Sequence, residues 1–256
     1  MPEIVIVGSA VEAGRIAASE IEKVVHAKTN AVLGLATGST PLTTWAALAE
    51  RSLDLSRVSG FALDEYVGLP KGHPESYRAV VDREVVDKLQ LTPSLVHVPG
   101  EGGTLESAGA RYEDAILAAG GIDLQLLGIG RNGHIGFNEP GASLASLSRV
   151  TLLTKQTRRD NARFFDSAAE VPTHAITQGL GTILRARRLV LVAFGAAKAP
   201  VIAAAIEGPL TTSVPASALQ LHPHSMVIVD EAAASHLANT EYYREAWENH
   251  HRGELD

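Results

Sequence analysis

The feature that most constrains the fold is an alternation of short apolar runs with segments whose apolar residues recur at helical spacing. The apolar runs, read as strands, are residues 4–7, 31–36, 60–63, 95–98, 123–129, 150–153, 188–194 and 226–229. Helical patterns cover residues 11–26, from 41 onward, 75–89, 105–119 and 196–207. Nearly continuous apolar strands between helices are typical of a mostly parallel sheet that is buried on both faces. We therefore predict an α/β fold, an open and doubly wound Rossmann-like sheet with helices on both faces.

The organisation along the chain favours one domain over residues 1–256. A chain of 256 residues fits one or two domains, and no internal repeat, low-complexity tract or Pro/Ser-rich linker divides it. The polar and basic stretch 153–172 is expected to form a helical flap that acts as an active-site lid. The N-terminus lacks the basic region of a targeting peptide, and no apolar stretch approaches the roughly 20 residues of a membrane helix. We therefore expect a cytoplasmic protein.

Composition and charge exclude several function classes. The chain contains no cysteine, which rules out disulfides, thiolate metal sites, iron–sulfur clusters and a cysteine nucleophile. The formal charge of −7 argues against a general binder of nucleic acid or anionic membranes. A small anionic substrate remains possible, because one local basic pocket suffices to bind it. His222 and His224 are two residues apart without an evident third ligand, so we predict no metal site.

The first candidate loop is Thr37-Gly38-Ser39-Thr40, between a predicted strand and a predicted helix. Glycine allows a tight turn and close approach of the backbone to a ligand. Ser39 or Thr40 can cap the helix, and Pro41 suits its first position. The N–H groups at such a helix start favour phosphate or carboxylate. A plain helix cap is the alternative, and the loop does not match the nucleotide-binding P-loop.

The second candidate is the pair Asp64 and Glu65, which follows a predicted buried strand. Ligands of open α/β sheets bind at the carboxyl ends of the strands. Neighbouring strand residues face opposite ways, so only one of the two carboxylates points into a given site. A carboxylate in this place is suited to be a general base. A helix cap or a buried ion pair is the alternative interpretation.

The third candidate is the glycine-rich loop 127–141, which follows the strongest predicted strand. Gly128 and Gly130 allow the backbone to lie against a ligand. His134 titrates nearest to neutral pH and can move protons. Asn132 and Glu139 are close in sequence, and Glu139 is expected to orient His134 or to act with it. The spacing GxGxxG occurs here, but its late position in the chain argues against a dinucleotide fingerprint.

A local excess of positive charge stands out in this acidic chain. Between Arg149 and Arg163 lie five basic residues and one acid. Lys198 follows the predicted strand 188–194 and is expected near the same sheet edge. Together with the Thr37–Thr40 loop, these cations suggest a phosphate site. A solvated basic helix is the alternative. The combined set suits acid–base chemistry, without a metal, on a phosphorylated small molecule.

The chain resembles the glucosamine-6-phosphate deaminase (isomerase) family from about residue 4 to 229. The motifs that carry the resemblance are Leu-Asp-Glu-Tyr-Val-Gly-Leu at 63–69, His-Pro-Glu-Ser-Tyr at 73–77, Gly-His-Ile-Gly-Phe-Asn-Glu-Pro at 133–140, Thr-Arg at 157–158 with Arg-Phe-Phe-Asp at 163–166, and Leu-Gln-Leu-His at 219–222. The same fold serves 6-phosphogluconolactonases, which typically lack the Phe-Asn-Glu-Pro continuation.

The resemblance implies a role for each candidate residue. Asp64 matches the base that moves a proton from C2 to C1 of the opened sugar. His134 matches the residue that opens the ring, and Glu139 matches the carboxylate that works with it. The phosphate contacts implied are the loop Thr37, Gly38, Ser39 and Thr40 with Arg163 and Lys198. The expected products are fructose 6-phosphate and ammonia, in amino-sugar (N-acetylglucosamine) catabolism, with no cofactor.

Two departures from the family pattern affect regulation and detail. Many relatives carry aspartate where this chain has Asn132, and an amide can orient His134 without a charge. The allosteric branch binds its effector, N-acetylglucosamine 6-phosphate, through serine, arginine and lysine, where this chain has Ala142, Arg149 and Thr151. We therefore expect little activation, and a monomer or small homo-oligomer rather than the allosteric hexamer.

Three other functions remain open from the sequence. The first is 6-phosphogluconolactonase activity, and the second is a preference for galactosamine 6-phosphate. The third is a catalytically inactive regulator that senses sugar phosphates. The presence of Asp64, His134 and Glu139 argues against the third.

Overall fold

The computed structural model describes residues 2–251, and its main feature is a seven-stranded sheet. In spatial order this sheet consists of β1 (Glu3–Val7), β10 (Ser225–Asp230), β9 (Arg188–Ala193), β6 (Leu124–Leu127), β2 (Val32–Leu35), β3 (Ser59–Ala62) and β5 (Val96–His97). All neighbouring pairs are parallel. The predicted parallel α/β sheet is confirmed, and seven of the eight predicted strands belong to it.

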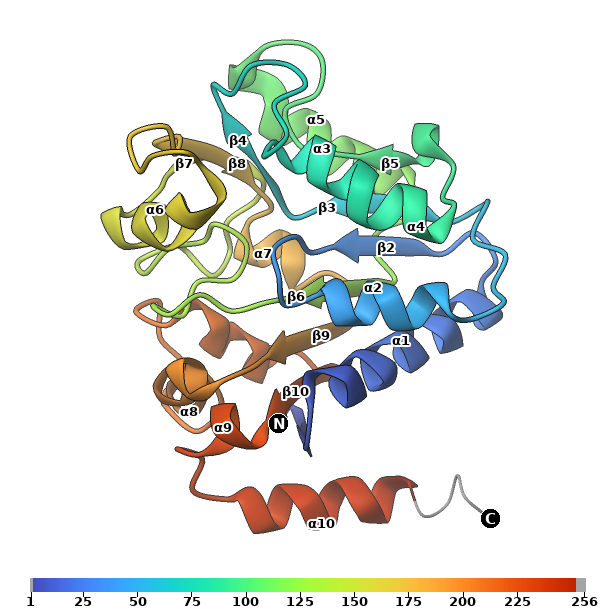
Figure 1. Ribbon diagram of the computed structural model, residues 1–256, viewed down its shortest axis with the longest axis vertical. Helices are drawn as coiled ribbons and strands as arrows, with labels where there is room; N and C mark the ends of the chain where they lie inside the picture. Colours follow the sequence, from blue (N-terminus) through green and yellow to red (C-terminus); the bar gives the residue numbers. More distant parts are fainter. Residues whose placement is uncertain (1, 252–256) are drawn as a thin grey trace.

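Helices cover the large sheet (Figure 1). The α-helices are α1 (Ala10–Ala27), α2 (Leu42–Ala49), α3 (Tyr77–Val81), α4 (Asp87–Leu89), α5 (Leu105–Ala118), α6 (Lys155–Asn161), α7 (Leu180–Ile183), α8 (Ala199–Ile206), α9 (Glu231–Ala234) and α10 (Thr240–His251). A π-helical segment, η1 (Asp82–Val86), joins α3 to α4, and short 3-10 helices include η3 (Ala162–Phe164), η4 (Ala196–Lys198) and η5 (Pro215–Leu221). Among the described residues, no helix is long and apolar enough to cross a membrane.

The central strands form the core. All residues of β2 and β6 are buried, as are five of the six residues in β9 and in β10. Burial on both faces explains why these strands have continuous apolar sequences instead of an alternating pattern. One polar residue, Gln125, sits in the middle of β6, and its side chain occupies the space that a Cβ on Gly34 would need.

The strand order places a topological switch point between β2 and β6. From β2 the chain proceeds through β3 to β5 at one edge, whereas from β6 it proceeds through β9 and β10 toward β1. Connections that leave two adjacent strands in opposite directions open a crevice at their carboxyl ends, where open α/β sheets bind ligands. The loops that follow β2 and β6 are the Thr37–Thr40 loop and the loop 128–141.

A second sheet was not predicted. β4 (Asp64–Val67), β8 (His174–Thr177) and β7 (Arg149–Leu152) form a three-stranded antiparallel sheet. It lies with α6 beyond the carboxyl ends of the large sheet (Figure 1). The strand predicted at 150–153 therefore belongs to this sheet and not to the parallel one. Asp64 and Glu65 do follow β3, but they begin an antiparallel strand instead of a loop.

Two further local expectations can be compared with the structure. The prediction that Ser39 or Thr40 caps α2 is wrong: Pro41 occupies the N-cap position, and no side chain hydrogen-bonds there. The stretch 153–172 does contain helical structure, α6 and η3. Whether it moves as a lid stays a prediction.

Candidate active site

The loop after β2 presents backbone N–H groups at the start of α2. Because α2 has no side-chain cap, its first N–H groups are not satisfied by a hydroxyl of the loop. Gly38 has a φ of +87°, and a Cβ added to it would meet no atom within 4 Å. The conformation therefore requires glycine, while the space beside it is open. Such a helix start attracts an anion.

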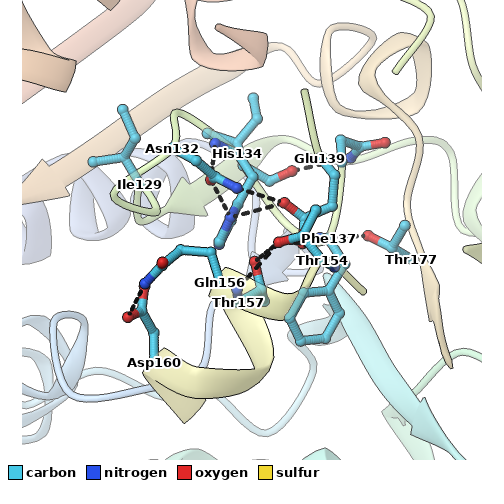
Figure 2. Close-up of polar contacts among 12 residues, drawn as sticks. Ile129, Asn132, His134, Phe137, Glu139, Thr154, Gln156, Thr157, Asp160 and Thr177 are labelled. Carbon is cyan, nitrogen blue, oxygen red and sulfur yellow. Dashed lines mark hydrogen bonds and ion pairs between the residues drawn. The ribbon is translucent and has the colours of Figure 1, made fainter. Parts of the chain in front are cut away.

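Three side chains of the loop after β6 form a hydrogen-bonded chain, shown in Figure 2. The Nδ1 atom of His134 lies 2.7 Å from Oδ1 of Asn132, and the His134 main-chain N–H donates to the same oxygen at 3.3 Å. The amide Nδ2 of Asn132 donates to Oε2 of Glu139 at 2.7 Å. Asn132 thus lies between the imidazole and the carboxylate, whose direct separation is 3.6 Å.

This chain determines which nitrogen of His134 carries the proton. A carboxylate accepts hydrogen bonds only, so the NH2 group of Asn132 faces Glu139 and its oxygen faces His134. Nδ1 of His134 must then donate, which leaves Nε2 of the neutral ring as the proton acceptor. The predicted pairing of His134 with Glu139 is therefore mainly indirect in this structure, through Asn132.

Glu139 is held as a permanent anion. Its Oε1 accepts the main-chain N–H of Thr154 at 3.1 Å and the Thr154 hydroxyl at 3.2 Å. Burial raises the pKa of Glu139, but contacts with His134, Thr157 and the Thr154 N–H outweigh burial and lower this pKa to about 2. Thr154 is also the N-cap of α6, so the carboxylate links the loop to the flap.

Three glycines of this loop lie in different structural surroundings. A Cβ on Gly130 would collide with the imidazole of His134, so the ring packs directly against the backbone there. A Cβ on Gly128 would meet nothing within 4 Å, which leaves its main chain accessible. Gly136 has a φ of +54°, and a Cβ there would lie 2.9 Å from Oγ1 of Thr177 and 3.5 Å from Oδ2 of Asp64. The histidine loop therefore passes directly over Asp64.

Asp64 is the second titratable group of the site. Only 5% of it is exposed, and within residues 2–251 its carboxylate has no hydrogen-bond or ion-pair partner. Burial and the neighbouring charge of Glu65 raise the pKa of Asp64 well above its usual range. Glu65 faces away and binds main-chain N–H groups, including those of Tyr77 and Arg78. Of the two predicted carboxylates, Asp64 is the one available for proton transfer.

A cluster of cations lies at the end of β6. Nζ of Lys198, in η4 after β9, donates to the main-chain oxygen of Ile129 at 2.6 Å. Burial lowers the pKa of Lys198, and the nearby positive charges of Arg131 and Arg163 lower it further, against the opposing effect of the Asp160 carboxylate. Three cations that repel one another in this way form a favourable site for a doubly charged phosphate. The structure thus brings the predicted residues Arg163 and Lys198 together.

Arg131 is a residue of this cluster that the sequence pattern did not single out. It sits inside the motif Gly-Arg-Asn-Gly-His, and its position three residues before His134 was the available signal. Tyr77 was also missed: its hydroxyl lies within reach of the Thr37 side chain and 3.4 Å from the hydroxyl of Tyr66. Thr154, which holds Glu139, could be found only from the fold.

Other singled-out residues have structural contacts. Nη1 of Arg149 donates to Oδ1 of Asn138 at 2.9 Å. His222 is buried, its Nε2 lies 2.8 Å from the Ala186 oxygen, and its Nδ1 accepts the His224 N–H. In the part of the chain that the structure describes, no group of three or more histidine, aspartate or glutamate side chains is arranged to hold a metal ion.

The fold and this site define an α/β protein of acid–base chemistry, with an isolated carboxylate and a histidine–amide–carboxylate chain beside a cationic cluster. The model of the family described as glucosamine-6-phosphate isomerases/6-phosphogluconolactonase matches residues 9–228. The chain belongs to this family.

Known relatives are similar over almost the whole length. The chain is 56% identical over 261 residues to a glucosamine-6-phosphate deaminase of Bifidobacterium longum subsp. infantis, covering 96% of this chain and 97% of the relative. It is 55% identical over 251 residues to a protein of the same name from Pseudarthrobacter chlorophenolicus, with the same coverage. The solved structure of a monomeric glucosamine-6-phosphate deaminase superimposes with a TM-score of 0.89 at 39% identity, covering 92% of this chain and 100% of that one.

More distant structures share the fold alone. A 6-phosphogluconolactonase from Trypanosoma cruzi superimposes with a TM-score of 0.75 at 21% identity, over 93% of this chain and 97% of that one. The same fold therefore occurs in proteins with more than one named activity.

Proposed function

We infer that this chain is a glucosamine-6-phosphate deaminase. It opens the ring of D-glucosamine 6-phosphate, isomerises the open sugar, and releases ammonia by hydrolysis to leave D-fructose 6-phosphate. Similarity to deaminases over nearly the full length supports this assignment. The geometric observation that carries it is the position of Gly136, which brings the His134 loop over Asp64. Two separate proton-moving groups thus meet at one site.

His134 is the group proposed for ring opening. Its free Nε2 takes the proton from the hydroxyl on C1 and returns it to the ring oxygen, as the bond between C1 and that oxygen breaks. The imidazolium that forms between these two transfers is stabilised by Glu139 through the Asn132 amide. Because this open aldehyde makes the C2 proton acidic, ring opening must precede the next step.

Asp64 is the base proposed for isomerisation. It takes the C2 proton, a C1=C2 double bond forms as the C1=O double bond breaks, and the former aldehyde oxygen takes up a proton from water. Asp64 then delivers its proton to C1, which leaves an imine at C2 that water hydrolyses to the ketone and ammonia. The raised pKa of Asp64 makes it a stronger base than an exposed aspartate, and this suits the removal of a carbon-bound proton.

The phosphate is proposed to lie between the Thr37–Thr40 loop and the cluster of Arg131, Arg163 and Lys198. The start of α2 follows β2, Gly128 and Gly130 follow β6, and these two strands are neighbours in the sheet. Fixing the phosphate at one end of the sugar positions C1 and C2 against the two proton-moving groups.

We further propose that the protein acts on this small substrate as a monomer in the cytoplasm, without a nucleic-acid or membrane partner. The monomeric deaminase with a TM-score of 0.89 supports the oligomeric state. A phosphorylated sugar does not cross a bilayer unaided, because its charge is costly to bury, which supports the compartment.

A direct assay tests the proposed function. The pure protein is incubated with glucosamine 6-phosphate, galactosamine 6-phosphate and 6-phosphogluconolactone in parallel, without added metal or nucleotide. We expect equal amounts of ammonia and fructose 6-phosphate from the first substrate. Turnover of the lactone alone would replace the proposal with the lactonase function, and preferred turnover of galactosamine 6-phosphate would change the assigned epimer.

A further inference from the structure

Glu65 has a set of contacts that the reaction described above does not use. It follows Asp64 directly in β4 and points to the other side of the strand. Its Oε1 accepts the main-chain N–H of Tyr66 at 2.7 Å and of Tyr77 at 2.9 Å, and its Oε2 accepts the N–H of Arg78 at 2.8 Å. Two of these three donors, the N–H groups of Tyr77 and Arg78, belong to α3, so the carboxylate attaches the beginning of α3 to the strand that carries Asp64.

The attached helix also reaches the substrate side of the site. Tyr77 is the first residue of α3, and its hydroxyl lies 3.4 Å from that of Tyr66 and within reach of the Thr37 side chain. A continuous series of contacts therefore joins Asp64, through Glu65 and α3, to the loop proposed to bind the phosphate. A change in how α3 sits on β4 would alter the distance between the base and the phosphate loop.

The charge of Glu65 acts on Asp64 as well. Glu65 is the one charged group that raises the pKa of Asp64, in addition to burial. The groups facing Asp64 from other positions are Tyr66 on β4, Tyr77 on α3 and Tyr112 on α5, and the pKa of each is itself raised, so all three are neutral near pH 7. Burial also raises the pKa of Glu65, and its three N–H donors and the positive charge of Arg78 offset only part of this rise in favour of the ionised form.

We propose that Glu65 is a positioning residue for the isomerisation step, which holds Asp64 at a fixed place relative to the phosphate loop and strengthens it as a base by a fixed neighbouring charge. This inference rests on the proposed function, because it assigns the C2 proton to Asp64. The neighbouring negative charge disfavours ionisation of Asp64 and so makes the ionised group a better proton acceptor. Glu65 itself does not contact the substrate.

Two variants separate the charge from the attachment. Glu65→Gln removes the charge and keeps the length of the side chain. Glu65→Asp keeps the charge and removes one methylene, so that the carboxylate no longer reaches α3. The matched control is Glu207→Gln, since Glu207 also accepts two main-chain N–H groups, from Ala238 at 2.7 Å and Asn239 at 3.0 Å, at the start of α10.

The readouts are kcat, KM and the pH dependence of kcat/KM for glucosamine 6-phosphate. For Glu65→Gln we expect the acid limb of the profile to move to lower pH, because Asp64 ionises more easily without a like charge beside it, and kcat to fall by roughly tenfold or more. For Glu65→Asp we expect the acid limb to stay in place and kcat to fall by a similar factor. Glu207→Gln should have the kcat of the wild type and the same acid limb.

The outcomes are distinguishable. A Glu65→Gln enzyme with an unshifted acid limb overturns the inference even if kcat falls, because a purely structural role gives that result. If Glu65→Gln does not fold, an undiminished kcat in Glu65→Asp overturns it instead. A wild-type protein that makes no fructose 6-phosphate contradicts the proposed function, and the inference fails with it; an active wild type with unaffected Glu65 variants contradicts the inference alone.

Discussion

At the residue scale, the site contains two carboxylates with opposite environments. Burial and a like charge raise the pKa of Asp64 well above its usual range. Burial acts on Glu139 too, but its hydrogen bonds prevail and lower the pKa to about 2. Environments that separate two pKa values in this way assign the roles of the groups. Asp64 is suited to exchange a proton in each turnover, while Glu139 remains an anion throughout.

The stability of Asp64→Asn tests this assignment. An unfolded aspartate ionises near pH 3.8, whereas Asp64 in the fold resists ionisation, so folding stability falls as pH rises from about 3.8 through the raised pKa. The variant lacks this loss and should resist urea more than the wild type at pH 8, with little difference at pH 3.5. Urea unfolding of Asp64→Asn and of the wild type at pH 8 and pH 3.5 measures this difference in stability.

The control for this measurement is Glu139→Gln. The ionised form of Glu139 stabilises the fold above pH 4.5, and this contribution is lost as pH falls from 4.5 toward 2. Glu139→Gln should therefore be less stable than the wild type at pH 8, whereas Asp64→Asn should be more stable. An Asp64→Asn protein that is less stable than the wild type at pH 8 would show that burial does not disfavour this charge.

Asn132→Asp tests the amide between His134 and Glu139. Aspartate would place a negative charge next to Nδ1 of His134, which favours the imidazolium. It would also place two carboxylates side by side, because the Asn132 side chain lies 2.7 Å from Glu139. We expect the acid limb of the ring-opening step to move to higher pH. Stopped-flow measurement of ring opening, with Asn132→Ser as the uncharged control, would detect this shift; identical profiles would contradict the proposed role of the amide.

At the element scale, the sequence predicts the parallel sheet and fails on the antiparallel one. β2, β6, β9 and β10 are buried on both faces, and this burial produces the apolar runs that identify them. β4 has the sequence Asp-Glu-Tyr-Val, whose acids resemble a loop, and its partner β8 lies 110 residues later. A four-residue strand stabilised by such a distant partner leaves little local signal.

The residues of the candidate site also separate into those that the sequence predicts and those that it does not. Asp64, His134, Glu139 and Lys198 are recognisable because each lies in a segment that follows a predicted strand, on the side of the sheet where parallel sheets bind ligands. Arg131 and Tyr77 depend on how loops fold over one another, and the choice between Asp64 and Glu65 depends on the N–H groups of α3. Spacing along the chain contains none of that information.

The flap and the loop after β6 provide an element-scale prediction. Arg163→Met should raise KM for glucosamine 6-phosphate roughly tenfold or more, with a smaller effect on kcat, since it removes one charge-assisted phosphate contact. Arg131→Met should act in the same direction. Arg159→Met is the matched control, because Arg159 lies on α6 and donates to Gln156. If all three variants had the KM of the wild type, Arg163 and Arg131 would not be phosphate contacts.

At the scale of the whole molecule, one scaffold supports related but different reactions. The fold is shared with 6-phosphogluconolactonases at 18–21% identity, whereas a deaminase at 39% identity superimposes more closely. That residues 1–256 form one domain stays a prediction, which a single cooperative unfolding transition would support.

Oligomeric state and regulation are also properties of the whole molecule. We expect a monomer in size-exclusion chromatography with light scattering, and a hyperbolic rate curve that N-acetylglucosamine 6-phosphate does not change. Arg149, at the position of the allosteric arginine, is engaged by Asn138 within the chain. A hexamer, or strong activation at low substrate concentration, would contradict this expectation.

The central claim is that Asp64 moves the C2 proton of a sugar opened at His134. The most direct measurement follows the C2 proton of glucosamine 6-phosphate by NMR in D2O, with the wild type and with Asp64→Asn at equal concentration. The account predicts that the wild type removes the C2 proton of glucosamine 6-phosphate and that Asp64→Asn does not. Loss of the C2 proton at the wild-type rate in Asp64→Asn would contradict the account.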